Sequence, residues 1–124
     1  MTQTAVIAGV GPGLGASIAR TFAANGCNVA LFARSEDYIE ALADDLPDSG
    51  DGLAVATDLQ DVAAIESSFE TVRDAYGSVD ILVNHASAAA WKGLTDISLE
   101  EFETAWEVNA RGAFICSREA IDDM

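Results

Sequence analysis

Short apolar runs alternate along this chain with longer stretches of helical periodicity. The runs hold few polar positions, which is typical of strands buried on both faces of a parallel sheet. They predict four strands, at Thr4–Ala8, Asn28–Phe32, Leu53–Ala56 and Val79–Val83.

Each predicted strand is followed by a stretch with apolar residues spaced three and four apart, which indicates a helix. The first helix starts near Leu14 and ends at Gly26, and the second is capped by Ser35 and stops at Pro47. The third spans Val62–Tyr76, and a capping box at Ser98-Leu-Glu-Glu101 opens the fourth. Crossovers of this length join parallel strands, so the prediction is an α/β fold: one doubly wound parallel sheet with helices on both faces.

The turn between the first strand and the first helix is rich in glycine. Gly11-x-Gly13-x-x-Ala16 fits a general dinucleotide-binding pattern, and Gly9-x-x-x-Gly13-x-Gly15 fits a longer variant. Without side chains in the turn, a phosphate can approach the backbone N–H groups and the positive end of the helix. The alternative is that these glycines only make a tight strand-to-helix turn. The other common phosphate loop needs a lysine, and the chain has only Lys92.

Four motifs in order make the chain resemble the short-chain dehydrogenase/reductase family. Ala8-Gly9-Val-Gly-Pro-Gly13-Leu-Gly15 is similar to the family's T-G-x-x-x-G-x-G loop, with Ala8 where Thr is usual. Asp58-Leu-Gln-Asp61 resembles its acidic motif, and Asn84-His-Ala-Ser87 resembles its N-N-A-G motif with changes at the second and fourth positions. Asn109-Ala-Arg-Gly112-Ala-Phe114 is similar to the segment that carries the family's active-site Asn.

The resemblance implies a Rossmann-type nucleotide-binding fold and hydride transfer between NAD(P) and a carbonyl or alcohol substrate. It implies that Asp58 contacts the adenine and that Asn109 takes part in catalysis by holding a water. It also implies that His85 lies beside the nicotinamide ribose, where we expect no catalytic role for it. The implied cofactor-binding residues are Gly9, Gly11, Gly13, Leu14, Gly15, Arg34, Asp58, Leu59, Asn84 and Ala86.

The end of the second strand bears on which cofactor is used. Ala33 stands where an acidic residue would select NAD(H) by binding the ribose 2′-hydroxyl, and Arg34 follows with a guanidinium suited to the 2′-phosphate. The sequence therefore favours NADP(H) over NAD(H). Alternatively, Arg34 pairs with Glu36 or Asp37 at the surface.

The family's catalytic Tyr and Lys, four residues apart, do not occur in this sequence. Leu42 lies four residues after Tyr38, and Asp80 lies four residues after Tyr76. We expect residues 1–124 to form one NAD(P)-binding domain, truncated after the fourth strand and its following helix. The alternative to an oxidoreductase is a catalytically incompetent dinucleotide-binding fragment, or an interaction module that borrows the fold.

Charge and composition limit the binding partners and the cell compartment expected for this protein. The formal net charge is −15, which opposes binding to nucleic acid or to an anionic membrane surface. The acidic bias favours a salt-loving source, and the alternative is an ordinary acidic cytosolic protein. Cys27 and Cys116 are predicted to be buried thiols of a cytoplasmic protein, and no metal site is expected. The fourth strand should be an exposed edge, so the chain is expected to be marginally stable, to self-associate or to be completed by another piece. Trp91 and Trp106 are expected in the core or an interface.

Overall fold

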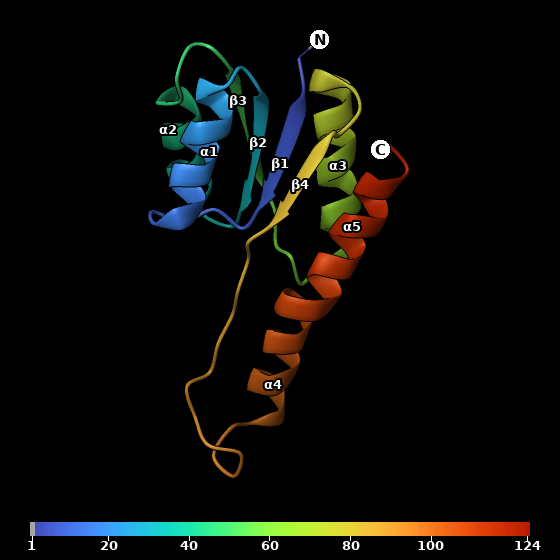
Figure 1. Ribbon diagram of the computed structural model, residues 1–124. Helices are drawn as coiled ribbons and strands as arrows, with labels where there is room; N and C mark the ends of the chain where they lie inside the picture. The colour runs from blue at the N-terminus through green and yellow to red at the C-terminus, as the bar shows by residue number, and fades with distance from the viewer. Residues whose placement is uncertain (1) are drawn as a thin grey trace.

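Four parallel strands form the sheet of the computed structural model, which describes residues 2–124. The strands are β1 (Thr4–Ala8), β2 (Asn28–Ala33), β3 (Asp51–Ala56) and β4 (Ile81–Asn84), and their order is β3-β2-β1-β4. The predicted Rossmann-type α/β sheet is therefore confirmed (Figure 1). Because Ala8 lies opposite both Phe32 and Asn84, the carboxyl ends of β1, β2 and β4 meet at one edge of the sheet.

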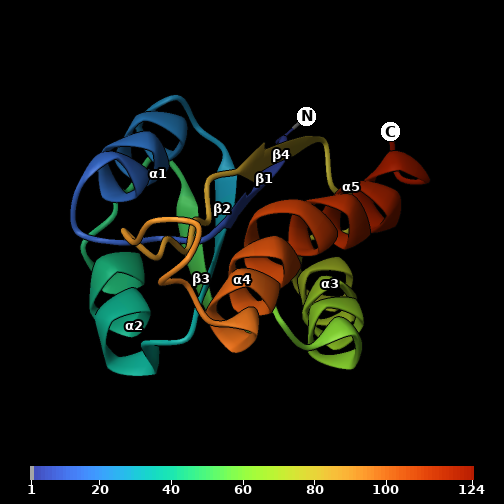
Figure 2. The same cartoon turned by 90° about the horizontal axis from the view of Figure 1, so that it is seen from below.

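Helices cover both faces of the sheet (Figure 2). Helices α1 (Leu14–Ala24) and α2 (Glu36–Asp44) pack on one face, and α3 (Val62–Tyr76) and α5 (Ala113–Ile121) pack on the other. Successive strand residues point to opposite faces, which separates the core into two layers. Val6 and Phe32 face α3, where the Phe32 and Phe69 rings meet edge to face at 5.3 Å, while Ile7 faces α1 and α2.

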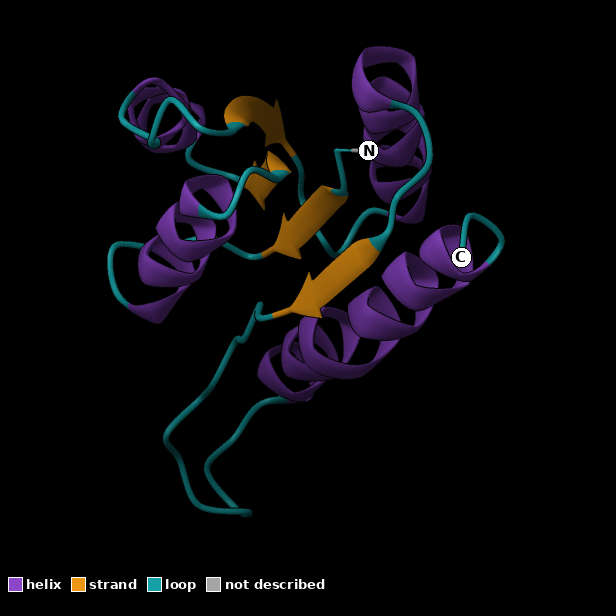
Figure 3. Ribbon diagram, turned by 45° about the horizontal axis from the view of Figure 1, so that its top comes forward, coloured by secondary structure: helices purple, strands orange, loops and turns teal. Residues whose placement is uncertain are grey.

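The last helical stretch is interrupted by a wider turn. α4 (Leu99–Trp106) continues into a π-helical segment, η1 (Glu107–Gly112), and then into α5. The helix predicted after the capping box is found, but the π turn within it was not predicted, because the 3.6-residue period of apolar positions does not reveal one. α4 and the long loop before it extend beyond the carboxyl edge of the sheet (Figures 1 and 3).

Four strand boundaries differ from the prediction: β2 and β4 each end one residue later, at Ala33 and Asn84, and β3 and β4 begin elsewhere. β3 begins at Asp51 rather than at Leu53, because Gly52 lets the strand lie against α2: a Cβ there would be 2.9 Å from the Ala43 carbonyl oxygen. β4 begins at Ile81 rather than at Val79, whose N–H donates instead to the Asp123 carboxylate at 2.9 Å.

The apolar surface is unevenly buried. β4 forms one edge of the sheet, as predicted. Trp91 is 95% exposed and Trp106 is 53% exposed, because the loop and α4 that carry them project away from the sheet. Of the two predicted settings, the core is therefore excluded, and an interface stays a prediction. Both cysteines are free and buried, as predicted. Within residues 2–124, no helix is long and apolar enough to cross a membrane.

Candidate functional site

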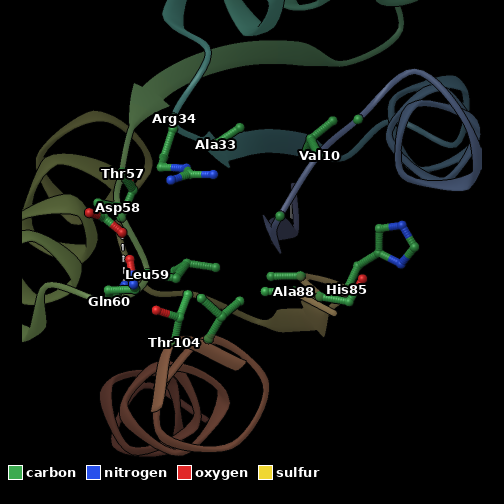
Figure 4. A pocket seen from close by; sticks show the side chains of 15 residues that line it. Val10, Ala33, Arg34, Thr57, Asp58, Leu59, Gln60, His85, Ala88 and Thr104 are labelled. Carbon is green, nitrogen blue, oxygen red and sulfur yellow. Dashed lines mark hydrogen bonds between the residues drawn. The ribbon is translucent and has the colours of Figure 1, made fainter. Parts of the chain in front are cut away.

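The largest concentration of candidate residues surrounds a cavity of about 350 Å³ at the carboxyl edge of the sheet. Its walls come from the β1–α1 turn, the end of β2, the β3–α3 turn, the β4–α4 loop and one side of the α4 helix (Figure 4). Ligands of doubly wound sheets bind outside the carboxyl ends of the strands, beside the point where strand order reverses. β1 is that point here, because β2 lies on one side of it and β4 on the other.

Gly9 shapes the floor of this cavity. Its φ is +94°, in the region that side-chain-bearing residues avoid, and its N–H donates to the Phe32 carbonyl at 2.9 Å. A Cβ on Gly9 would lie 2.4 Å from the Cα of Ala86, in the loop after β4. The absence of a side chain therefore brings the β1–α1 turn directly against the β4–α4 loop.

Gly11 and Gly13, unlike Gly9, are not packed against another segment. A Cβ built on either would meet nothing within 4 Å, so both face open space. Among residues 2–124, no protein acceptor takes the N–H groups of Gly11, Gly13, Leu14 or Gly15. The turn thus presents unpartnered donors at the start of α1, where a helix carries partial positive charge. This donor set fits the pyrophosphate of a dinucleotide.

Leu14 and Gly15 do not line the cavity. The Leu14 side chain is 64% exposed and does not line the cavity, so its backbone N–H is its contribution to the turn. Gly15 is buried, and a Cβ there would lie 3.1 Å from the His85 ring. Gly15 therefore leaves room for His85, which lines the cavity beside α1 (Figure 4).

Arg34 lines the cavity from the end of β2, on the side away from α1 (Figure 4). It is exposed, and within residues 2–124 no carboxylate lies within 4.0 Å of its guanidinium. The alternative in which Arg34 pairs with Glu36 or Asp37 is therefore wrong. Its five N–H donors face the cavity opening without an anionic partner.

Asp58 and Leu59 line the cavity from the β3–α3 turn. One carboxylate oxygen of Asp58 accepts the Gln60 N–H at 2.9 Å, which closes a tight local turn, and Asp61 caps α3 by accepting the Ala64 N–H at 3.1 Å. The second carboxylate oxygen of Asp58 remains available to a ligand. Leu59 is buried and supplies an apolar wall.

Asn84 and Asn109 lie at a neighbouring cavity of about 40 Å³, which Leu59 and Ala86 also line. Asn84 does not line the larger cavity; its side-chain amide donates to Ser117 on α5 at 3.1 Å. Asn109 lies in η1 and bonds the backbone of Ala88 twice, accepting its N–H at 2.9 Å and donating to its carbonyl at 2.6 Å. Asn109 thus fixes the β4–α4 loop rather than its own helix.

Several lining residues had no role assigned from the sequence. Gln60 and Ser87 lie inside the motifs that begin at Asp58 and Asn84, and Thr57 and Ala88 flank those motifs, so their position in or next to a motif was the only available signal. Thr104 and Val108 line the cavity from one face of the α4–η1 helix, four residues apart. Their spacing is visible in the sequence, but that this face turns toward the cavity depends on the tertiary packing.

Neither tyrosine is available for proton transfer at this cavity. The Tyr76 hydroxyl donates to Asp51 at 2.7 Å, at the opposite end of β3. Burial, and secondarily the Asp51 carboxylate, raise the pKa of the Tyr76 phenol above its usual range. Tyr38 is on α2 and packs against the core. Residues 2–124 hold no group of three or more His, Cys, Asp or Glu that could bind a metal.

Comparison with known proteins assigns the family. The model of the short chain dehydrogenase family matches residues 3–124, so this chain belongs to that family. An uncharacterized oxidoreductase of Thermotoga maritima is 35% identical over 98% of the chain. The chain covers 48% of that protein, and it spans about half the length of the curated relatives it matches.

Solved structures give the same architecture. An alcohol dehydrogenase from Thermococcus sibiricus, complexed with 5-hydroxy-NADP, superposes with a TM-score of 0.94 at 31% identity, covering 99% of this chain and 53% of the other. A 3-ketoacyl-(acyl-carrier-protein) reductase from Brucella melitensis, complexed with NADH, superposes with a TM-score of 0.90 at 32% identity. That alignment covers 98% of this chain and 49% of the reductase.

Proposed function

We propose that residues 1–124 form the dinucleotide-binding domain of an oxidoreductase that transfers hydride between NADP(H) and a carbonyl or alcohol substrate. The observation that carries the proposal is the β1–α1 turn, where unpartnered N–H groups face space that no side chain fills. In support, similar structures were solved with 5-hydroxy-NADP and with NADH.

In this proposal the glycine turn holds the pyrophosphate without any lysine. The N–H groups of Gly11, Gly13, Leu14 and Gly15 donate to it, and the α1 dipole adds to the attraction. Neutral backbone donors suit a chain of net charge −15, because the anion is attracted locally even though the overall field repels it.

The other walls of the cavity are proposed to hold the rest of the cofactor and to select NADP(H) over NAD(H). Arg34 binds the 2′-phosphate through two parallel hydrogen bonds, and Asp58 and Leu59 hold the adenine. Ala86 packs under the cofactor beside Gly9, and Asn84 supports it from the end of β4 through the smaller cavity. Asn109 is the one catalytic residue we assign to this chain.

The bound cofactor supplies the hydride, while this chain's residues orient it and shield it from water. The Tyr76 phenol does not move a proton here, since it is bonded to Asp51 far from the cavity. A second candidate function is therefore binding of the dinucleotide without turnover by these residues alone. The chain's lack of a Tyr with a Lys four positions later favours it.

Titrating the protein with NADPH and NADH, followed by calorimetry, tests the proposal. Arg34→Ala should weaken NADPH binding by about 1–3 kcal/mol, a factor of roughly 5 to 150, and leave NADH binding unchanged. Arg118→Ala is the matched control, because Arg118 is exposed on α5 and packs over Phe114 away from the cavity. An unchanged NADPH-to-NADH ratio in Arg34→Ala would show that the 2′-phosphate assignment is wrong.

Catalysis needs its own measurement. Oxidation of NADPH over a panel of ketones separates an enzyme from a binder, and we expect turnover only when a Tyr-x-x-x-Lys segment is supplied. NADPH oxidation by the 124-residue chain itself would contradict this expectation.

We also propose a cytoplasmic location, which the two buried free thiols support, and a salt-rich source, which the acidic surface supports. Self-association is proposed because Leu99, Phe102 and Trp106 expose apolar side chains along α4. Sedimentation of the protein over a range of concentrations tests the oligomeric state.

A further inference from the structure

The segment η1 contacts both sides of the cavity through two residues that lie two positions apart. On one side Asn109 bonds the backbone of Ala88 in the β4–α4 loop. On the other side the Arg111 guanidinium donates through Nη2 to the carbonyl oxygen of Gln60, in the turn that carries Asp58. This π-helical segment therefore connects two loops through Gln60 and Ala88, which are 28 residues apart in the sequence.

We infer that Arg111 is a positioning residue of the dinucleotide site, which holds the Asp58–Gln60 turn in place for the adenosine end of the cofactor. This inference rests on the proposed function. Arg111 itself does not line the cavity; it acts through the Gln60 backbone.

The contact between η1 and this turn has a second, independent support. A Cβ on Gly112 would lie 3.0 Å from the Leu59 carbonyl oxygen and 3.5 Å from the Leu59 Cβ. Gly112 therefore lets η1 approach the turn closely, next to the residue that bonds it. Since Leu59 lines both cavities, this approach also sets one wall of the site.

Other contacts hold the turn at its start and at its base. The Thr57 N–H donates to the Ala33 carbonyl at 2.9 Å, and Leu59 is buried in the core. Within the turn, Gln60 N–H donates to the Asp58 carboxylate at 2.9 Å and Asp61 N–H donates to the Asp58 carbonyl at 3.0 Å, and these two bonds fix only its local shape. The Arg111 bond spans 51 residues and ties the Gln60 end of the turn to η1.

Arg111 is itself oriented by a neighbour. Glu107, one turn earlier in η1, lies 3.8 Å from the guanidinium, and both side chains are 31% exposed. A pair this exposed contributes little to folding. Glu107 therefore helps to orient the guanidinium toward the Gln60 carbonyl. Because the Arg111 side chain is not part of the core, its replacement should leave the fold intact.

The test compares Arg111→Met, which keeps much of the aliphatic length but has no donor, with Arg111→Lys, which restores one. Arg118→Met is the control on α5. Affinities for adenosine 2′,5′-bisphosphate and for NADPH are measured by calorimetry, and amide hydrogen exchange is measured without ligand. Arg111→Met should weaken both ligands by the same factor, about three- to tenfold, as for loss of one hydrogen bond. Arg111→Lys should recover most of this loss, and Arg118→Met should cause none.

Hydrogen exchange tests the role of Arg111 independently of whether the protein binds a dinucleotide. In Arg111→Met the amides of Gln60 and Asp61 should exchange faster, while those of β1 stay unchanged. Unchanged exchange and unchanged affinity would overturn the inference, and so would a loss for NADPH without a loss for the bisphosphate. If the unsubstituted protein binds neither ligand, the proposed function fails, whatever the exchange rates show.

Discussion

Two glycines of the same turn should respond in opposite ways to the addition of one methyl group. At Gly9 an alanine would have to keep a φ of +94° and place its Cβ 2.4 Å from the Cα of Ala86. The left-handed backbone costs about 1–2 kcal/mol, and forcing an extra carbon against buried backbone costs about 1–3 kcal/mol. Gly9→Ala should therefore lower the free energy of unfolding by about 2–5 kcal/mol.

Gly11 supplies the matched comparison. Its φ is not in the left-handed range, and a Cβ there meets no atom within 4 Å. Gly11→Ala should leave the free energy of unfolding within about 0.5 kcal/mol of the original. Because its methyl group enters the space assigned to the pyrophosphate, it should nevertheless weaken dinucleotide binding.

Urea unfolding followed by far-ultraviolet circular dichroism is the suitable assay. Tryptophan fluorescence is a poor reporter here, since Trp91 and Trp106 are already 95% and 53% exposed in the folded protein. Equal stability of Gly9→Ala and the original protein would refute the packing argument. A Gly11→Ala protein that is stable and binds NADPH unchanged would refute the pyrophosphate site.

Three further predictions concern cysteine reactivity, pH and salt. Burial raises the pKa of Cys116 to about 12, so iodoacetamide should label Cys116 slowly in the folded protein and readily in urea. Mass spectrometry measures the rate of labelling. Fast labelling of the folded protein would contradict the burial of this thiol. Hydrogen bonds from Lys92, and then from Ser98, lower the pKa of Glu101 from 4.5, so these contacts stabilise α4 above that pH and are lost as the pH falls through the lower folded-state value. Lys92→Met should raise the Glu101 midpoint in an NMR titration, and an unmoved midpoint would rule the contact out. The melting temperature should rise in molar potassium chloride because salt screens the repulsion of a −15 chain, whereas equal melting in dilute buffer would remove the support for a salt-rich source.

Local pattern was sufficient to predict the sheet and the position of the glycine-rich turn. Apolar runs such as Thr4–Ala8, followed by helical periodicity, have few arrangements other than a parallel sheet with right-handed crossovers. The glycine spacing from Gly9 to Gly15 was visible because a backbone that must approach a phosphate requires residues without side chains. The capping box at Ser98 and Glu101 was likewise predicted and found, since its two hydrogen bonds join residues three apart.

Contacts between distant segments were decided by the tertiary structure. No local pattern indicated that Gly9 excludes a side chain because of Ala86, that Asn109 bonds Ala88, or that Asn84 turns toward Ser117. Each of these contacts depends on the angle at which one element packs on another, and on the π turn in η1, which no apolar period encodes. The residues proposed to bind a dinucleotide could therefore be picked out from the sequence, whereas the way in which the loops carrying them are held together was decided only by the tertiary structure.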